Sequence, residues 1–275
     1  HDSDLFARWQ AITDLALPNL TAAAGAAAKG KPISCDKGLL DALLAIAADE
    51  SLEPAFRAQA LTLPSESDIA RELGSNNDPD AIHAGRQGIL KEIAVAGAAT
   101  FEALYKGLVS DAAYSPDAAS AGRRSLRNAA LGFLALSENT PIAAAEAFAK
   151  ADNMTDLSQA LTVLAHRFPD SPETHAALAS FEKRFASNAL VLDKWFQIQA
   201  TIPGDGSLDR IMRLMQNPNF NVSNPNRVRA LIGTFAFGNP TGFNRADGTA
   251  YRFFAEQVLS IDKRHACSRT ARSGL

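Results

Sequence analysis

Two arginines, Arg227 and Arg229, are the residues whose type and spacing point most directly to chemistry in this chain. They follow Asn224-Pro225, in which asparagine is suited to cap a helix and proline to occupy its first turn. Both arginines therefore lie in the first turn of a predicted helix, where the helix dipole favours anions over cations. Small apolar residues follow and predict a buried helix body. We interpret the two cations as partners of a negative group, such as a ligand carboxylate.

The alternative for the same two arginines is structural. One of them could form a salt bridge inside the domain or reach acids on an adjacent domain.

Arg123, Arg124 and Arg127 form the densest basic cluster of the chain. We interpret that cluster as a solvated helix face that pairs with nearby acids. A nucleic-acid site would require more basic residues interleaved with aromatic ones, and the net charge of −3 gives no general attraction to polyanions.

Catalytic motifs do not appear in this sequence. Zinc peptidases use His-Glu-x-x-His, which puts two imidazoles on one helix face, and no histidine here has a second one four residues later. A Gly-x-Ser-x-Gly elbow and a glycine-rich phosphate loop are missing too. Asp205, Asp209 and Asp247 stand beside glycines but lack the alternating acids of a calcium loop, so we interpret them as turn residues. The sequence predicts no catalytic residue, no metal ligand and no cofactor of its own.

Helix-start signals recur along the chain as a capping residue followed by proline. They occur at Asp78-Pro79, Ser115-Pro116, Thr140-Pro141, Ser171-Pro172 and Asn224-Pro225. Apolar residues from Phe6 to Leu20 predict a first helix that is interrupted near Pro18, and Leu39 to Ala47 predict a second. Strand alternation is absent. We expect an all-α fold of stacked antiparallel helical hairpins in a curved, superhelical array, although no fixed sequence period establishes a regular solenoid.

Composition agrees with closely packed helices. Hydrophobic residues make up 47% of the 275 residues and aromatic ones only 7%, and alanine is abundant. No apolar run approaches the roughly 18–20 residues that span a bilayer. The two cysteines, Cys35 and Cys267, are too far apart for a metal motif and form no disulfide framework, which suits a reducing compartment. We therefore expect a cytoplasmic protein with no membrane partner.

Four stretches together resemble one family. They are His1–Asp4, Asp152–Asp156, Val191–Thr201 and Asn224–Ala236, the last followed by Phe237-Gly-Asn-Pro240. In this order they resemble the C-terminal helical domain of bacterial aminopeptidases N, which belong to the M1 family of zinc metallopeptidases. The resemblance runs from His1 to about Arg264. The start at His1-Asp2, without Met or a signal pattern, indicates an excised fragment.

The resemblance implies a location for the two arginines. In the family this helix faces the internal cavity above the zinc, and the position matching Arg229 lines the space that receives the C-terminal side of the peptide. Arg229 is therefore the first candidate for a substrate-cavity residue and Arg227 the second. The zinc ligands and the Gly-x-Met-Glu-Asn signature that holds the substrate amine are not in this chain. Zinc is implied for the parent enzyme only.

The end of the chain departs from the family. From His265 the apolar periodicity is lost and small and basic residues predominate, whereas the family continues with helices that close the domain. We expect residues 1–264 to form the helical domain and residues 265–275 an aberrant or disordered tail that leaves an apolar face uncovered. Further cavity residues of the family come from the helix after Arg264 and have no counterpart here.

Two functions from different classes fit the sequence. In the first, the chain is the non-catalytic lid domain of a zinc-dependent aminopeptidase and controls access of peptides to the active site. Its partners are then the catalytic domain of the same parent chain and, in the intact enzyme, the peptide substrate. In the second, it is an independent helical scaffold that binds a partner protein through its concave face.

Overall fold

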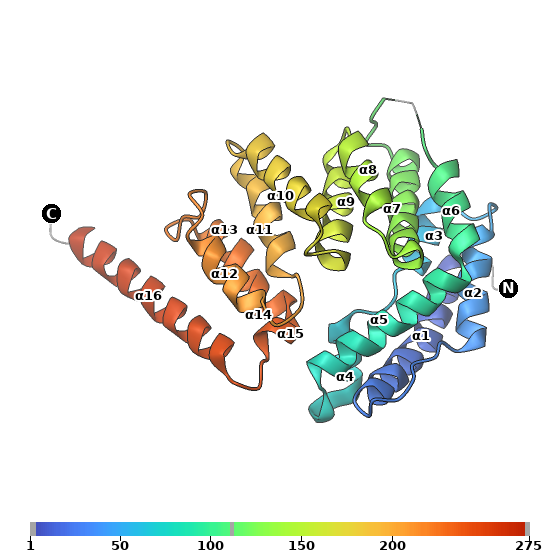
Figure 1. Cartoon of the computed structure of the whole chain (residues 1–275), viewed down its shortest axis with the longest axis horizontal. Coiled ribbons are helices and arrows are strands. Elements are labelled where there is room, and N and C mark those ends of the chain that lie inside the picture. Colours follow the sequence, from blue (N-terminus) through green and yellow to red (C-terminus); the bar gives the residue numbers. More distant parts are fainter. Residues whose placement is uncertain (1–3, 111–112, 273–275) are drawn as a thin grey trace. The chain divides into compact units, whose positions relative to one another are not determined.

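The computed structural model describes residues 4–110 and 113–272, and for Asn76 and residues 264–272 it describes the backbone only. Every regular element in the described part is a helix (Figure 1). The chain divides into two compact units, His1–Ala177 and Leu178–Leu275, and the boundary falls within α10 (Pro172–Phe185). No helix among the described residues is long and apolar enough to cross a bilayer.

The first unit contains the helices up to the start of α10. They are α1 (Leu5–Ala27), α2 (Lys37–Ala48), α3 (Pro54–Ala60), α4 (Glu66–Leu73), the short 3-10 turn η1 (Gly74–Asn76), α5 (Pro79–Ala96), α6 (Ala98–Gly107), α7 (Ala118–Glu138), α8 (Ile142–Lys150) and α9 (Met154–Arg167). The second unit continues with α11 (Ala189–Ala200), α12 (Ser207–Met215), α13 (Pro225–Val228), the π-helical turn η2 (Arg229–Gly233), α14 (Thr234–Gly238), α15 (Pro240–Phe243) and α16 (Thr249–Arg272).

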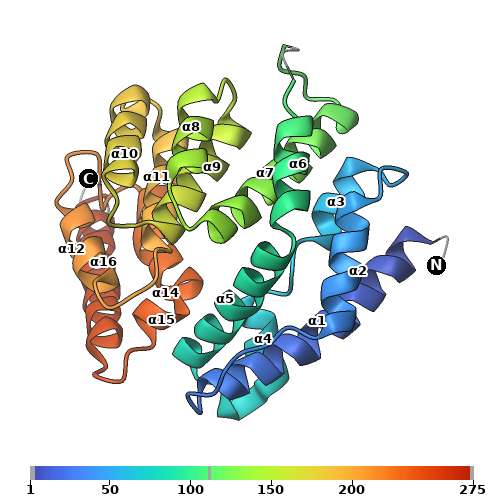
Figure 2. The same ribbon diagram turned by 45° about the vertical axis from the view of Figure 1, so that its right-hand side comes forward.

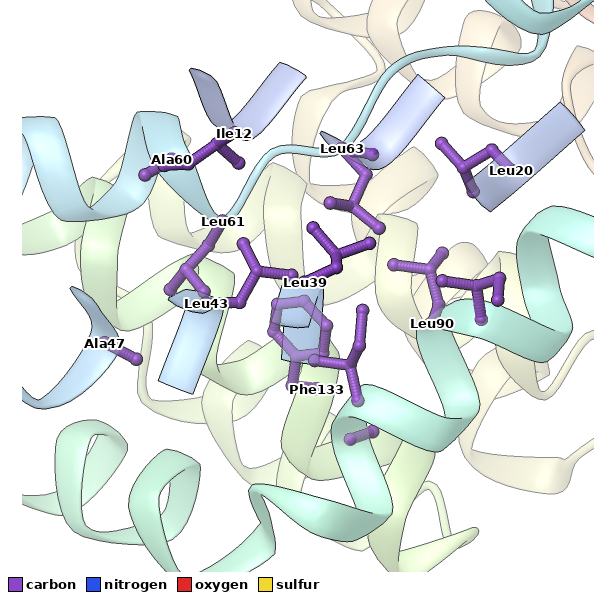
Figure 3. Packing of buried hydrophobic residues seen from close by; sticks show 14 of the residues in the cluster. Ile12, Leu20, Leu39, Leu43, Ala47, Ala60, Leu61, Leu63, Leu90 and Phe133 are labelled. Carbon is purple, nitrogen blue, oxygen red and sulfur yellow. The ribbon is translucent and has the colours of Figure 1, made fainter. Parts of the chain in front are cut away.

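The core of the first unit is built from leucine, isoleucine and alanine. Leu39 and Leu43 of α2 meet Leu61, Leu90 and Phe133 from other segments, as Figure 3 shows. Each such side chain contributes about 1.5–3 kcal/mol when it is fully buried. Leucine periodicity from residue 39 to 47 thus predicted α2 correctly, because its apolar stripe is the face that enters this core.

Helices α1 and α5 approach each other closely and run side by side in Figures 1 and 2. Gly85 of α5 faces the backbone of α1, where a Cβ atom on residue 85 would lie 2.5 Å from the nitrogen of Ala24. Glycine is required at this position because no neighbouring side chain could rotate away. The contact is made by backbone atoms.

Three of the five proline signals mark helix starts as predicted. Asp78 caps α5, Ser171 Oγ accepts from the N–H of Thr174 at the start of α10, and Asn224 caps α13. Helices α7 and α8 also follow the other two signals, but Ser115 and Thr140 are not their caps. The cap of α7 is Asp117, which accepts from the N–H of Ser120, and Pro141, which precedes α8, forms no side-chain cap.

The expected interruption of the first helix near Pro18 was also wrong, because α1 runs through it from Leu5 to Ala27. Pro18 lies on the exposed face, so water can solvate the carbonyl that loses its hydrogen bond. Ile12, Ala16 and Leu20 lie on the buried face and remain in the core. Packing along one face therefore outweighs the local cost of proline.

The long helix α16 includes residues on both sides of the expected boundary at Arg264, since it extends from Thr249 to Arg272. Side chains from Arg264 onward lie outside the described part, and residues 273–275 lie outside it entirely. The division into a domain of residues 1–264 and a tail of residues 265–275 stays a prediction.

Alanine substitutions at two helical glycines test the α1–α5 contact. We expect Gly85→Ala to lower the free energy of unfolding by about 1–3 kcal/mol, because the added methyl group overlaps the α1 backbone. Gly132→Ala in α7 is the control, since nothing lies within 4 Å of its added Cβ. It should raise the free energy of unfolding by about 0.5–1 kcal/mol through helix propensity. Urea denaturation measures both, and equal effects at the two glycines would contradict the contact.

Candidate functional site

The predicted helix at Asn224-Pro225 is present as one continuous helical segment, α13–η2–α14. The side chain of Asn224 accepts hydrogen bonds from the N–H groups of Asn226 (3.0 Å) and Arg227 (3.4 Å). The middle of the segment is a π-type turn, and Thr234 Oγ1 donates to the carbonyl of Arg229 five residues earlier at 3.1 Å. Leu231 and Phe235 are fully buried, which confirms the buried helix body.

Arg227 points into the second unit. It is only 4% exposed, and its Nε lies 3.2 Å from Asp193 Oδ1 of α11. Its Nη2 donates to the carbonyl of Ala189 at 3.3 Å, and its guanidinium carbon lies 4.8 Å from the centre of the Phe196 ring. A buried cation is tolerated when an opposite charge and hydrogen bonds compensate its lost hydration. These contacts are the salt bridge within the domain that the sequence left open as an alternative.

The stretch from Asp193 to Phe196 supplies the other half of this contact. Trp195 and Phe196 are buried, and Trp195 Nε1 donates to the carbonyl of Leu178 at 2.9 Å. Asp193 faces Arg227, while Lys194 is exposed. The block is therefore structural, and it joins α11 to the helix that carries the two arginines.

Arg229 differs from Arg227 because its side chain is exposed. Its Nη1 donates to Asn226 Oδ1 at 3.3 Å, one turn earlier on the same face. A single neutral partner leaves most donors of the guanidinium available. The structure thus brings the two predicted residues together on one helix but turns them to opposite sides. The role of both arginines in a substrate cavity stays a prediction. Only Arg229 presents its charge at the surface, where a ligand could reach it.

Asn239 is a residue whose role sequence reasoning missed. It is 2% exposed, and its Nδ2 donates to the carbonyls of Ala200 and Ile202, both at 2.9 Å. Its Oδ1 accepts from the N–H of Gly242 at 3.0 Å, so it also caps α15. The signal was visible, since Asn239-Pro240 repeats the cap-and-proline pattern of Asn224-Pro225. Asn239 fixes the end of the arginine-bearing helix against the end of α11.

The basic cluster on α7 is only in part the solvated face that we expected, because Arg123 is exposed and its two neighbours are not. Arg124 and Arg127 are half-buried and stack on tyrosines, with the guanidinium carbons 4.6 Å from the Tyr114 ring and 4.9 Å from the Tyr105 ring. They line a cavity of about 400 Å³ that also contains Asp156. Cation–π contacts of this kind stabilise a guanidinium that is partly removed from water. The cavity has both signs of charge on its walls.

Candidate metal ligands do not gather in the described part of the chain, where no three His, Cys, Asp or Glu side chains come together. His83 is half-buried, and its Nδ1 lies 2.7 Å from Glu66 Oε1. Folding therefore brings no alternative set of zinc ligands together among the described residues.

Cys35 has an unusual electrostatic setting. Burial, together with the nearby carboxylates of Glu92 and Asp36, raises the pKa of its thiol to about 11. The backbone N–H of Cys35 donates to Glu92 Oε2 at 2.5 Å, which fixes that carboxylate beside the sulfur. A thiol with this pKa is protonated at neutral pH and is a poor nucleophile.

Comparison with known families gives a match that covers nearly the whole chain. A family model described as a domain of unknown function (DUF3458_C) with ARM repeats matches residues 1–270. ARM repeats stack helices into a superhelix. The match and the helices together confirm the predicted all-α class of stacked helical hairpins in a superhelical array.

Relatives of known name are aminopeptidases. The chain is 38% identical over 264 residues to aminopeptidase N of Caulobacter vibrioides, and 34% identical over 267 residues to that of Escherichia coli. These alignments cover 95% and 96% of this chain but only 30% of each relative. A solved structure of Legionella pneumophila aminopeptidase A with aspartic acid is similar with a TM-score of 0.81 and 27% identity, over 95% of this chain and 31% of that one. The predicted resemblance is confirmed.

Substitution of Arg227 tests the buried ion pair. We expect Arg227→Ala to lower the free energy of unfolding by about 3 kcal/mol, because it leaves the carboxylate of Asp193 without its cation. Arg229→Ala is the matched control two residues away and should change stability by less than about 0.5 kcal/mol. The double variant Arg227→Met with Asp193→Leu should recover most of the loss. Equal denaturation midpoints for the two single variants would rule out a structural role for Arg227.

Alkylation of Cys35 tests its electrostatic setting in a Cys267→Ser background. A pKa of about 11 leaves so little thiolate at pH 8 that iodoacetamide should react on the order of 100-fold more slowly than with an ordinary exposed thiol. The rate should still rise with pH beyond pH 9.5. Glu92→Gln removes one of the negative charges and should speed the reaction. A rate that levels off near pH 9 would contradict this assignment.

Proposed function

The chain belongs to the ARM-repeat domain family DUF3458_C, and we propose that it is the non-catalytic lid domain of a zinc-dependent aminopeptidase. In this role it encloses the active-site cavity and controls the access of peptides during removal of their N-terminal residues. The observation that carries the proposal is the alignment of 95% of this chain with aminopeptidase N at 38% identity.

The partner of this chain would be the catalytic domain of the same parent protein. The chain spans about 30% of the length of the relatives that it matches, which leaves ample length for a catalytic domain elsewhere. Zinc would be bound there and would activate the water that attacks the peptide bond. The described residues of this chain bring no ligand set for that ion together, so no step of the reaction is assigned to them.

The chain would contribute a wall and one polar contact. A closed wall excludes bulk water, which strengthens polar contacts inside the cavity, and it excludes folded proteins by size. Arg229 would bind the carboxylate or a carbonyl on the C-terminal side of the peptide, a charge-assisted contact worth about 1.5–3 kcal/mol in a sheltered site. Arg227 would support it from inside, because its ion pair with Asp193 holds the first turn of the helix.

The cytoplasmic location that we expect belongs to the same proposal. It rests on the wide separation of Cys35 and Cys267 in the sequence. The alternative of an independent protein-binding scaffold has no specific contact in its favour, and the experiment below distinguishes it.

Mixing this chain with a parent enzyme that lacks it tests the lid function directly. We expect a version of the parent enzyme that ends before His1 to hydrolyse trialanine poorly, and addition of this chain to restore much of the activity.

In the intact enzyme, Arg229→Ala should raise KM for trialanine about tenfold, equivalent to about 1.4 kcal/mol, with the zinc content unchanged. Arg213→Ala, an exposed arginine on α12, is the control. If neither mixing nor Arg229→Ala has an effect, and a stable protein partner co-purifies, the scaffold function is correct.

A further inference from the structure

The exposed face of the α13–η2–α14 segment combines a cation, a gap and an aromatic ring. Arg229 is exposed, and four residues later Gly233 faces open space, because a Cβ atom there would meet only Arg229 Cβ at 3.8 Å. Four residues further, Phe237 is 84% exposed. One exposed phenylalanine is common on protein surfaces. The distinguishing feature is the series of Arg229, Gly233 and Phe237 at equal spacing, which we call the Arg229–Phe237 strip.

The π-type turn keeps the three residues in line. In an α-helix, residues eight apart are rotated by about 80° around the axis, since a turn has 3.6 residues. The wider turn from Arg229 to Gly233 takes up an extra residue and reduces this rotation. Leu231 and Phe235 lie fully buried on the other side of the same segment. The turn thus presents the cation and the ring on one face while the core contacts are kept on the other.

The charge of the strip is not neutralised from within its own helix. Residues 225–238 contain two arginines and no acidic residue. Arg227 is paired with Asp193 in the interior, whereas the partner recorded for Arg229 in this helix is the neutral amide of Asn226. The strip therefore favours an anion at the Arg229 end and an apolar group at the Phe237 end.

We propose that the Arg229–Phe237 strip binds the C-terminal end of a peptide with an apolar side chain a few residues before its carboxylate. The carboxylate pairs with Arg229, the peptide backbone passes over Gly233, and the apolar side chain packs on the Phe237 ring. Eight helical residues extend about 12 Å, which an extended peptide covers in about four residues. The apolar side chain is thus expected three residues before the C-terminus. This substrate class rests on the proposed function, which places peptides beside Arg229.

Peptide binding to this chain tests the inference, with acetyl-Leu-Ala-Ala-Ala as the probe in an NMR titration. We expect Phe237→Ser to weaken binding of this peptide about fivefold and to leave acetyl-Ser-Ala-Ala-Ala unaffected. Arg229→Ala should remove the preference for the free acid over the C-terminal amide. Phe6→Ser is the matched control, because Phe6 is 67% exposed but lies in the first unit.

Gly233→Leu provides a second, independent variant. Residue 233 has φ −63° and ψ −46°, which leucine adopts readily, and the space around it is open. The variant should keep the melting temperature and weaken binding of every peptide at least tenfold, because the side chain fills the path of the backbone. The inference is wrong if acetyl-Leu-Ala-Ala-Ala does not bind, or if Phe237→Ser and Gly233→Leu bind it like the wild type. If acetyl-Leu-Ala-Ala-Ala binds but the mixing experiment restores no activity, the lid function is contradicted and peptide binding by the Arg229–Phe237 strip is still supported.

Discussion

The buried charge of Arg227 is the constraint on which the architecture of the second unit depends. A guanidinium that is 4% exposed requires an opposite charge, and Asp193 of α11 provides it. The ring of Phe196 and the carbonyl of Ala189 also contact it. Ala189, Asp193 and Phe196 all belong to α11. The ion pair between Arg227 and Asp193 therefore sets the rotation of α13 about its own axis. That rotation decides which residues of the following helix face outward.

Neighbouring arginines consequently have different roles within one turn. Residues two apart on a helix point in nearly opposite directions, so Arg227 is held inside while Arg229 is outside. Elsewhere the same residue type is stabilised in other ways. Arg57 is buried and donates to the carbonyl of Ala47 near the end of α2, and Arg124 stacks on Tyr114. A basic residue in this sequence is therefore a poor guide to a ligand until its partners are known.

Local features of the fold could be predicted, and contacts between distant segments could not. The caps at Asp78 and Asn224 were recognisable because side chain and first turn are adjacent in sequence. The cap of α7 was misassigned because Asp117, two residues after Ser115, competes for the same role. The sequence left the function of Arg227 open, since Asp193 is 34 positions away. The π-type turn has no local sequence signature, so the outward alignment of Arg229 and Phe237 required the structure.

The double donation by Asn239 has a consequence for the chemical ageing of the protein. Asparagine residues are commonly lost when the backbone nitrogen of the next residue attacks the side-chain amide and forms a succinimide. Proline follows Asn239, and its nitrogen carries no hydrogen, so this route to deamidation is blocked. An aspartate formed here would turn a negative oxygen toward the carbonyls of Ala200 and Ile202. The proline that starts α15 therefore also protects the amide that holds the helix ends together.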